Sequence, residues 1–173
     1  MQLGVEYKGL DEYSAMLRGL PSEVRAPLLK RAAQITQNII RLNLNRSTAT
    51  WKHKPMFDIK SKTTDRDVSV TADTDSDIYR YVDEGTRRHT IEPRGSGYPL
   101  RFRTGYAAKT RPNVLSSGQG GASGPYVRAW SVQHPGTTPR RISQGTMRAA
   151  LNALRSALDT LWQKAVQQAV KRR

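Results

Sequence analysis

The chain has 173 residues, of which 29 are Lys or Arg and 14 are Asp or Glu, and its formal net charge is +15. It contains no cysteine, so disulfides, thiol nucleophiles and thiolate metal sites are excluded. It has neither about eighteen consecutive apolar residues nor a basic amino-terminal region before an apolar run, so we expect no membrane span and no signal peptide. The length fits one domain over residues 1 to 173, and 36% hydrophobic residues allow a modest core, which favours association with identical subunits.

The positive charge is concentrated in the second half of the chain. No carboxylate side chain occurs between Glu92 and Asp159. The cations of this stretch are Arg94, Arg101, Arg103, Lys109, Arg111, Arg128, Arg140, Arg141, Arg148 and Arg155. Because no ion pair can form within the stretch, they require phosphates, solvent or acids from elsewhere. Head-to-tail pairing of the acidic middle with the basic second half would suit a ring; a solvated basic surface that keeps the protein soluble is the alternative.

Apolar periodicity predicts a long helix in the first third of the chain. Two shorter elements precede it, a strand with Leu3, Val5 and Tyr7 and a helix over 11–17. The long helix opens at Pro21 and Ser22 and runs to about Leu44, roughly 35 Å at the standard rise. Its expected apolar stripe consists of Val24, Leu28, Ala32, Ile35, Ile39 and Leu42. Such a helix either packs partly on a neighbouring subunit or, more simply, lies across a sheet.

A hairpin and a short helix follow. The segments 56–60 and 68–72, joined by a polar turn, are typical of an antiparallel hairpin with one solvated face. Asp75 or Ser76 then caps a helix, and Gly85 ends it in the left-handed conformation. The helix carries Ile78, Tyr81 and Val82, and Tyr81 and Val82 are expected to pin it to the core.

A second sheet is expected from the segments 89–92, 99–103 and 126–133. Period-two alternation places Leu100 and Phe102 inward and Arg101 and Arg103 together on the opposite face. These two arginines form either a basic stripe for phosphate contact or the charge that protects an edge strand from aggregation.

The Gly-rich segment 104–124 is expected to be a flexible loop that becomes ordered on a partner, with Lys109 and Arg111 as docking residues. It does not fit a phosphate-binding loop, because a strand rather than a helix follows it and Gly-Lys-Ser/Thr is absent.

The last predicted helix begins at Ser143 and ends in the basic residues 171–173, which suit the negative end of the helix dipole. Its apolar positions are Met147, Leu151, Leu154, Leu158, Leu161, Trp162, Ala165 and Val166. Together the elements predict an α+β fold, a small, mainly antiparallel sheet flanked by a long N-terminal helix and a long C-terminal helix.

Chemical sites are poorly supported. The candidates are three histidines and three aspartates, His53, His89, His134, Asp73, Asp75 and Asp77. The histidines are too far apart for a helical zinc motif, and His134 before Pro135 is expected to hold a turn by hydrogen bonding. The aspartates allow a Mg²⁺-dependent nuclease, but acids before a helix more often cap it. We therefore predict no enzymatic activity, no cofactor and no metal.

Two motifs resemble a known family. The segments 81–89 (YVDEGTRRH) and 132–141 (VQHPGTTPRR), with the Leu-Arg-Phe strand at 100–102 between them, resemble the paired signature of the tail-completion or neck proteins, which join head and tail in long-tailed bacteriophages. The order of the motifs and the long helices fit as well. The segment 104–124 is longer than the usual connection in that family.

The resemblance implies a structural virion protein that completes the tail or joins it to the head connector, as a homo-oligomeric ring assembled in the bacterial host cytoplasm. Implied partners are further copies of the chain, adjacent connector and tail proteins, and the duplex DNA in the channel, held weakly and without sequence preference. Asp83 and Glu84 are then expected at the subunit interface. The expected DNA-facing residues are Arg101, Arg103, Arg140 and Arg141.

Two further functions stay open. A tail terminator that caps the tail tube is a neighbouring role that the sequence does not separate from tail completion. A nonspecific nucleic-acid-binding protein is suggested by charge alone. Against it, few aromatic residues are interleaved with the cations, the exceptions being Phe102, Tyr106, Tyr126 and Trp130.

Overall fold

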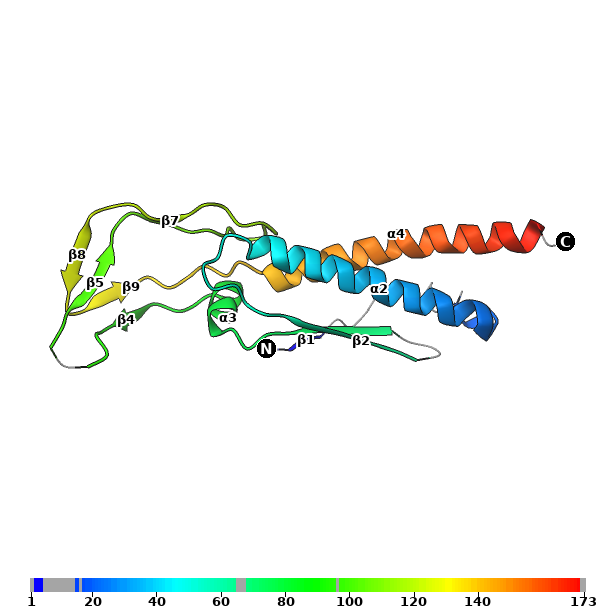
Figure 1. Ribbon diagram of the computed structural model, residues 1–173, viewed down its shortest axis with the longest axis horizontal. Helices are drawn as coiled ribbons and strands as arrows, with labels where there is room; N and C mark the ends of the chain where they lie inside the picture. Colours follow the sequence, from blue (N-terminus) through cyan, green and yellow to red (C-terminus); the bar gives the residue numbers. More distant parts are fainter. Residues whose placement is uncertain (1, 5–14, 16, 65–67, 96, 172–173) are drawn as a thin grey trace. The chain divides into compact units, whose positions relative to one another are not determined.

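The computed structural model describes residues 2–4, 15, 17–64, 68–95 and 97–171 (Figure 1). Its helices are α2 (Ser22–Ser47), α3 (Asp77–Glu84) and α4 (Ile142–Lys171). Its strands are β1 (Gln2–Gly4), β2 (Asp58–Thr63), β3 (Val68–Asp73), β4 (His89–Ile91), β5 (Leu100–Arg103), β6 (Tyr106–Ala107), β7 (Gly121–Ala122), β8 (Tyr126–Ala129) and β9 (Val132–His134). The fold is α+β, with small antiparallel sheets and long N-terminal and C-terminal helices, as the sequence predicts.

The contacts divide the chain into two compact units where the sequence predicts one domain. Unit 1 contains Met1–Leu44, Met56–Thr74 and Ser143–Arg173, and unit 2 contains Asn45–Pro55 and Asp75–Ile142. Each unit therefore combines segments that are distant in the sequence.

Unit 1 has a three-stranded antiparallel sheet in the order β1-β3-β2. The predicted hairpin is confirmed as β2 and β3, with Ile59 opposite Ala72. Alternate residues of β3, Val70 and Ala72, are buried, which gives the sheet one apolar face. Leu3 lies in β1 as predicted, but the rest of that predicted strand and most of the helix over 11–17 lie outside the described residues.

The buried face of α2 differs from the predicted stripe. Val24 and Leu42 are 40% and 52% exposed. The buried positions recur every three or four residues and include polar ones: Leu29, Ala32, Ala33, Thr36, Ile40, Asn43, Leu44 and Ser47. Thr36 is tolerated there because its hydroxyl donates to the carbonyl oxygen of Ala32 at 2.9 Å. A stripe drawn only through apolar residues therefore misplaced this face.

The long helices of unit 1 pack against each other. Ala32 of α2 forms a buried cluster with Leu154 and Leu158 of α4, and Figure 1 shows the two helices side by side. Both leucines were predicted to be apolar contacts of the last helix. Burial of each contributes about 1.5–3 kcal/mol to folding.

Unit 2 contains one long hairpin with nested pairing. β4 pairs with β9, β5 with β8 and β6 with β7, and all three pairs are antiparallel. Isolated bridges join Thr86 to Thr137 at its base and Thr110 to Ser117 near its tip. We call residues 86–137 the β arm. The predicted second sheet is thus split into separate ribbons, and between β4 and β5 the break coincides with Pro93 and Pro99, which cannot donate ladder hydrogen bonds.

Candidate functional site

The two motifs of the sequence meet at the base of the β arm. The amide of Thr86 donates to the carbonyl oxygen of Thr137 at 3.0 Å, and the amide of Thr137 donates back to the carbonyl oxygen of Thr86 at 3.1 Å. The Thr86 hydroxyl also accepts from the Thr137 amide at 2.9 Å. Segments 81–89 and 132–141 are therefore held together by backbone bonds rather than by charge.

Two glycines make this junction possible. Gly85 has φ +79° and Gly136 has φ +90°. A Cβ on Gly85 would lie 2.5 Å from the Thr137 carbonyl oxygen and 2.8 Å from Cδ of Pro139. One on Gly136 would collide with the carbonyl oxygen of Thr86. Gly85 ends α3 as predicted, but its ψ of 174° is extended rather than left-handed helical, because the chain leaves directly into the pairing with Thr137.

The histidines of the motifs are cross-strand neighbours. His89 lies opposite His134 in the β4–β9 ribbon, with ring centroids 5.0 Å apart. Nδ1 of His134 accepts the Gly136 amide at 3.1 Å, which confirms that this side chain holds the turn at Pro135. Nδ1 of His89 donates to the Arg87 carbonyl oxygen at 2.8 Å. Both rings are thus used for local backbone hydrogen bonds.

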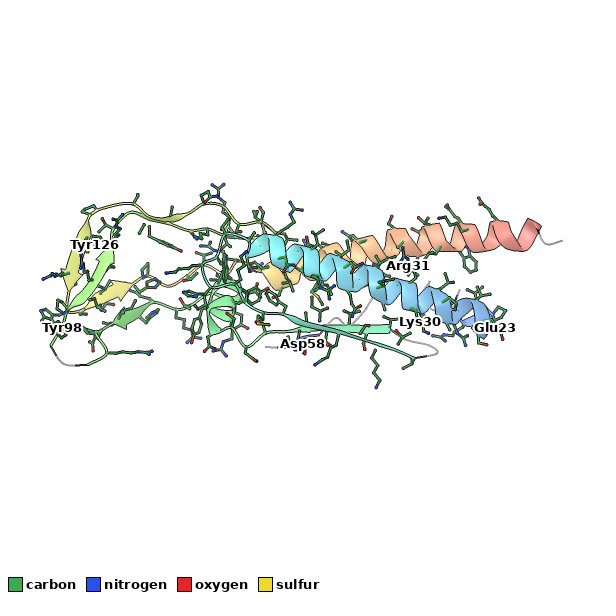
Figure 2. The ribbon with its side chains drawn as sticks, viewed as in Figure 1. Glu23, Lys30, Arg31, Asp58, Tyr98 and Tyr126 are labelled. Carbon is green, nitrogen blue, oxygen red and sulfur yellow. The ribbon has the colours of Figure 1, made fainter. Side chains whose placement is uncertain are left out.

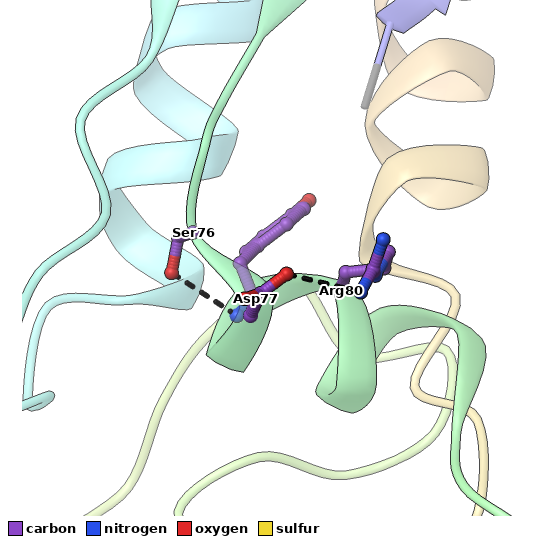
Figure 3. A network of polar contacts seen from close by, with 4 residues as sticks. Ser76, Asp77 and Arg80 are labelled. Atoms are coloured by element: carbon purple, nitrogen blue, oxygen red, sulfur yellow. Dashed lines mark hydrogen bonds and ion pairs between the residues drawn. The ribbon is translucent and has the colours of Figure 1, made fainter.

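Helix α3 is capped as predicted but packs through a different side chain. The Ser76 hydroxyl accepts the Tyr79 amide at 3.2 Å, and Asp77 pairs with Arg80 at 3.0 Å (Figure 3). The predicted anchor Tyr81 is 48% exposed, whereas Tyr79 is fully buried. On a helix of two turns, the motif alone does not reveal which tyrosine faces inward.

Asp83 and Glu84, the two residues predicted at the subunit interface, differ in burial. Asp83 is 5% exposed, and its carbonyl oxygen accepts the amide of Arg141 at 3.1 Å. Glu84 is exposed. Only Glu84 of the two therefore offers its carboxylate to a neighbouring molecule.

The four arginines predicted to face DNA lie in two different places. Arg140 and Arg141 follow the junction and are held against the end of α3, where the amide of Arg140 donates to the Val82 carbonyl oxygen at 3.0 Å. Arg140 is half-buried and its Nε atom is buried, whereas Arg141 is exposed. Arg101 and Arg103 lie on β5, within the β arm, and are exposed.

The β5–β8 ribbon adds two residues to Arg101 and Arg103. Arg101 lies opposite Arg128, and Arg103 lies opposite Tyr126. Cross-strand partners share a face, so we call these four residues the arginine–tyrosine face. The guanidinium carbons of Arg101 and Arg103 lie 4.6 Å and 4.7 Å from the Tyr126 ring centroid, and Tyr126 lies on β8 (Figure 2). The alternation Tyr-Val-Arg-Ala at 126–129 indicates that Tyr126 and Arg128 share a face of their strand. Which residues lie opposite them follows only from the strand register.

The tip of the β arm is anchored to the segment after α2. Nζ of Lys109 donates to the Thr50 carbonyl oxygen at 2.5 Å, and the Thr50 hydroxyl donates to the Gly118 carbonyl oxygen at 2.7 Å. The amide of Ser117 donates to the Arg46 carbonyl oxygen at 3.2 Å, which satisfies a carbonyl in the last turn of α2. Lys109 thus has an internal role, while Arg111 is exposed. The flexibility expected of 104–124 stays a prediction.

A pocket of about 250 Å³ lies beside this anchor within unit 2. Its lining combines apolar and cationic side chains: Trp51, Lys52, His53, Ile78, Val82, Tyr106, Lys109 and Thr110. Among the described residues, no group of three His, Asp or Glu side chains is arranged to hold a metal ion.

Comparison of the chain with protein-family models, with curated proteins and with solved structures found no match. In the described part of the chain, no helix has both the length and the apolar character needed to cross a membrane.

Proposed function

We propose that this chain is a structural protein of the neck of a long-tailed bacteriophage virion, which completes the tail or joins it to the head connector as a ring around the DNA channel. The observation that carries the proposal is the pairing of Thr86 with Thr137, because it joins the two motifs on which the resemblance rests into one structure. The glycines of both motifs have a direct steric role in this pairing.

The proposed mechanism is geometric rather than chemical. Each ribbon of the β arm has only two described strands, so both strands of a ribbon are edge strands, which a strand of a neighbouring subunit can pair with. The arm also carries large exposed side chains, namely Ile91, Tyr98, Phe102, Tyr106, Val114, Tyr126 and Trp130. Apolar surface of this kind favours association with identical or adjoining subunits. Connector and tail proteins would then be the further partners, with assembly in the host cytoplasm.

The test is the state of association of the purified protein. Light scattering together with negative-stain images is expected to show closed rings with a central channel. A monomer at all concentrations, alone and mixed with connector and tail proteins from the same genome, would contradict the proposal. A ring found only at the free end of purified tail tubes would instead identify a tail terminator.

A second candidate is a nucleic-acid-binding protein without sequence preference that acts outside a virion. The packing of Tyr126 against two arginines favours it, because it interleaves an aromatic ring with cations. Tight DNA binding by a monomer that never forms rings would support this candidate over the first.

A further inference from the structure

We propose that the arginine–tyrosine face binds the phosphate backbone of duplex DNA without reading its sequence. This inference rests on the proposed function, because the DNA in question is the duplex that fills the channel. It keeps Arg101 and Arg103 of the expected DNA-facing set and adds Arg128 and Tyr126, because the register puts these two opposite Arg101 and Arg103. Arg140 and Arg141 lie outside this ribbon, where their backbone amides bond to the end of α3.

The charge of the face is unbalanced. Arg101 and Arg128 are directly opposite each other, and like charges in that relation destabilise a sheet. Within the described part of the chain, none of Arg101, Arg103 and Arg128 forms an ion pair with a carboxylate. A bound polyanion would remove this repulsion.

Tyr126 holds two of the arginines in place. Its ring holds the guanidinium groups of Arg101 and Arg103 at nearly equal distances, an arrangement worth about 0.5–1 kcal/mol for each cation at an exposed site. The two arginines are two residues apart on β5, about 7 Å at the usual strand rise. Guanidinium groups held in advance lose less entropy when they bind phosphate, and their planar N–H donors match phosphate oxygens.

The face suits duplex DNA better than single-stranded DNA. Single strands bind by stacking bases on free aromatic faces. The Tyr126 ring is already in contact with two guanidinium groups, so it is a poor platform for a base. The face has no Asn or Gln that would read adenine, and duplex DNA presents its phosphates outward, within reach of three exposed arginines. Arginine can also read guanine, so the comparison of duplexes of unrelated sequence tests whether the contact is to phosphate alone.

Protection of an edge strand does not account for this arrangement. Charge that guards an edge requires no particular cation and no aromatic neighbour. Here the three cations on this face of the ribbon are all arginine, and two of them, Arg101 and Arg103, lie over one ring. Replacement of all three by lysine separates the two explanations, because it keeps the charge and removes the planar donors.

The experiment measures fluorescence anisotropy of labelled duplexes with the full chain between 50 and 200 mM salt. The test variant is the triple substitution Arg101→Gln, Arg103→Gln and Arg128→Gln. The matched control, Arg87→Gln, Arg88→Gln and Arg94→Gln, removes the same charge from exposed arginines of the same unit. We expect the test variant to lower the slope of log affinity against log salt by about 0.9 for each lost phosphate contact, or about 2.7 in all. The control should change the slope much less.

Sequence preference, the lysine variant and single-stranded DNA provide further tests of the face. Two duplexes of unrelated sequence should bind the wild-type protein equally, and the triple lysine variant should bind more weakly than wild type with most of the slope kept. Equal slopes for the test and control variants would overturn the inference, as would tighter binding of single-stranded than of duplex DNA. Circular dichroism verifies that each variant is folded. The anisotropy measurement can be made on rings or on monomers, so the absence of rings would contradict the proposed function alone, and equal slopes would contradict the role of this face alone.

Discussion

The ring of Tyr79 packs against the ring of Trp51, with centroids 6.3 Å apart and planes tilted by 43°. Trp51 follows α2 and Tyr79 belongs to α3, so this contact joins two separate segments of unit 2. Tyr79 is fully buried, while Tyr81, in the first motif, is largely outside the core. The contact therefore assigns the anchoring role in α3 to a residue that lies before the motif.

The two tyrosines are expected to differ strongly on truncation. Tyr79→Ala should lower the free energy of unfolding by about 3–5 kcal/mol, because it empties a filled site in the core. Tyr81→Ala should lower it by about 1 kcal/mol or less, since it removes an exposed ring with one arginine above it. Urea denaturation of the two variants compares them directly. Equal losses would show that both tyrosines anchor α3, and a larger loss for Tyr81→Ala would show that α3 packs through Tyr81.

The junction of the motifs is expected to require glycine at position 85. Gly85→Ala should destabilise the protein by about 3 kcal/mol, because φ +79° with ψ 174° is almost confined to glycine and the added methyl meets Thr137 and Pro139. Gly118→Ala is the matched control, since the nearest atom to its added Cβ lies 3.9 Å away. Thermal unfolding by calorimetry measures both. A Gly85→Ala protein as stable as the control would mean that the junction shifts freely.

The cap of α3 is expected to depend on an acceptor at position 76 rather than on the ion pair beside it. Ser76→Ala should cost about 1 kcal/mol because the Tyr79 amide loses its acceptor, and Ser76→Asp should restore most of that loss. Asp77→Asn breaks the exposed pair with Arg80 and should cost about 0.5 kcal/mol or less. Chemical denaturation distinguishes the three variants, and a larger loss for Asp77→Asn than for Ser76→Ala would reverse this assignment.

The anchor at the tip of the β arm is expected to protect backbone amides. Thr50→Val combined with Lys109→Met removes two hydrogen bonds, worth about 2 kcal/mol together, so exchange at Ser117 and Gly118 should accelerate roughly 30-fold. Hydrogen exchange followed by mass spectrometry measures this change. Arg111→Gln, at an exposed position of the same tip, should leave exchange unaltered. Fast exchange at these amides already in the wild-type protein would favour the flexible loop expected from the sequence.

Assembly is expected to depend on Glu84 rather than on Asp83. Asp83→Lys would bury a lysine and so destabilise the fold, and a loss of rings could then result from unfolding. The informative variant is therefore Glu84→Lys. It should reduce ring formation in light scattering while the monomer stays folded. Glu92→Lys makes the same charge change at another exposed site and should assemble normally. If both variants form rings like the wild type, the acidic middle is not the partner of the basic half.

Local sequence determined which elements form. The start of α2 at Ser22, the cap at Ser76, the hairpin of β2 and β3, and the shared face of Arg101 and Arg103 depend on neighbours in the chain, and all were predicted. The turn at His134 belongs to the same class, because its hydrogen bond reaches only two residues ahead. Such features need no information from distant segments.

Tertiary structure decided what the elements face. Thr36 lies in the buried stripe of α2, where a hydrogen bond within the helix satisfies its hydroxyl, but which side of the helix is buried depends on the elements that pack on it. Arg128 and Tyr126 join Arg101 and Arg103 only through the register of strands that are distant in sequence. The nested closure of the β arm, from Thr86 with Thr137 to Thr110 with Ser117, likewise arises from pairing between distant residues. The burial of a side chain and the register of a strand depend on the segments packed or paired with it. In this chain those segments are distant in the sequence and meet only in the folded protein.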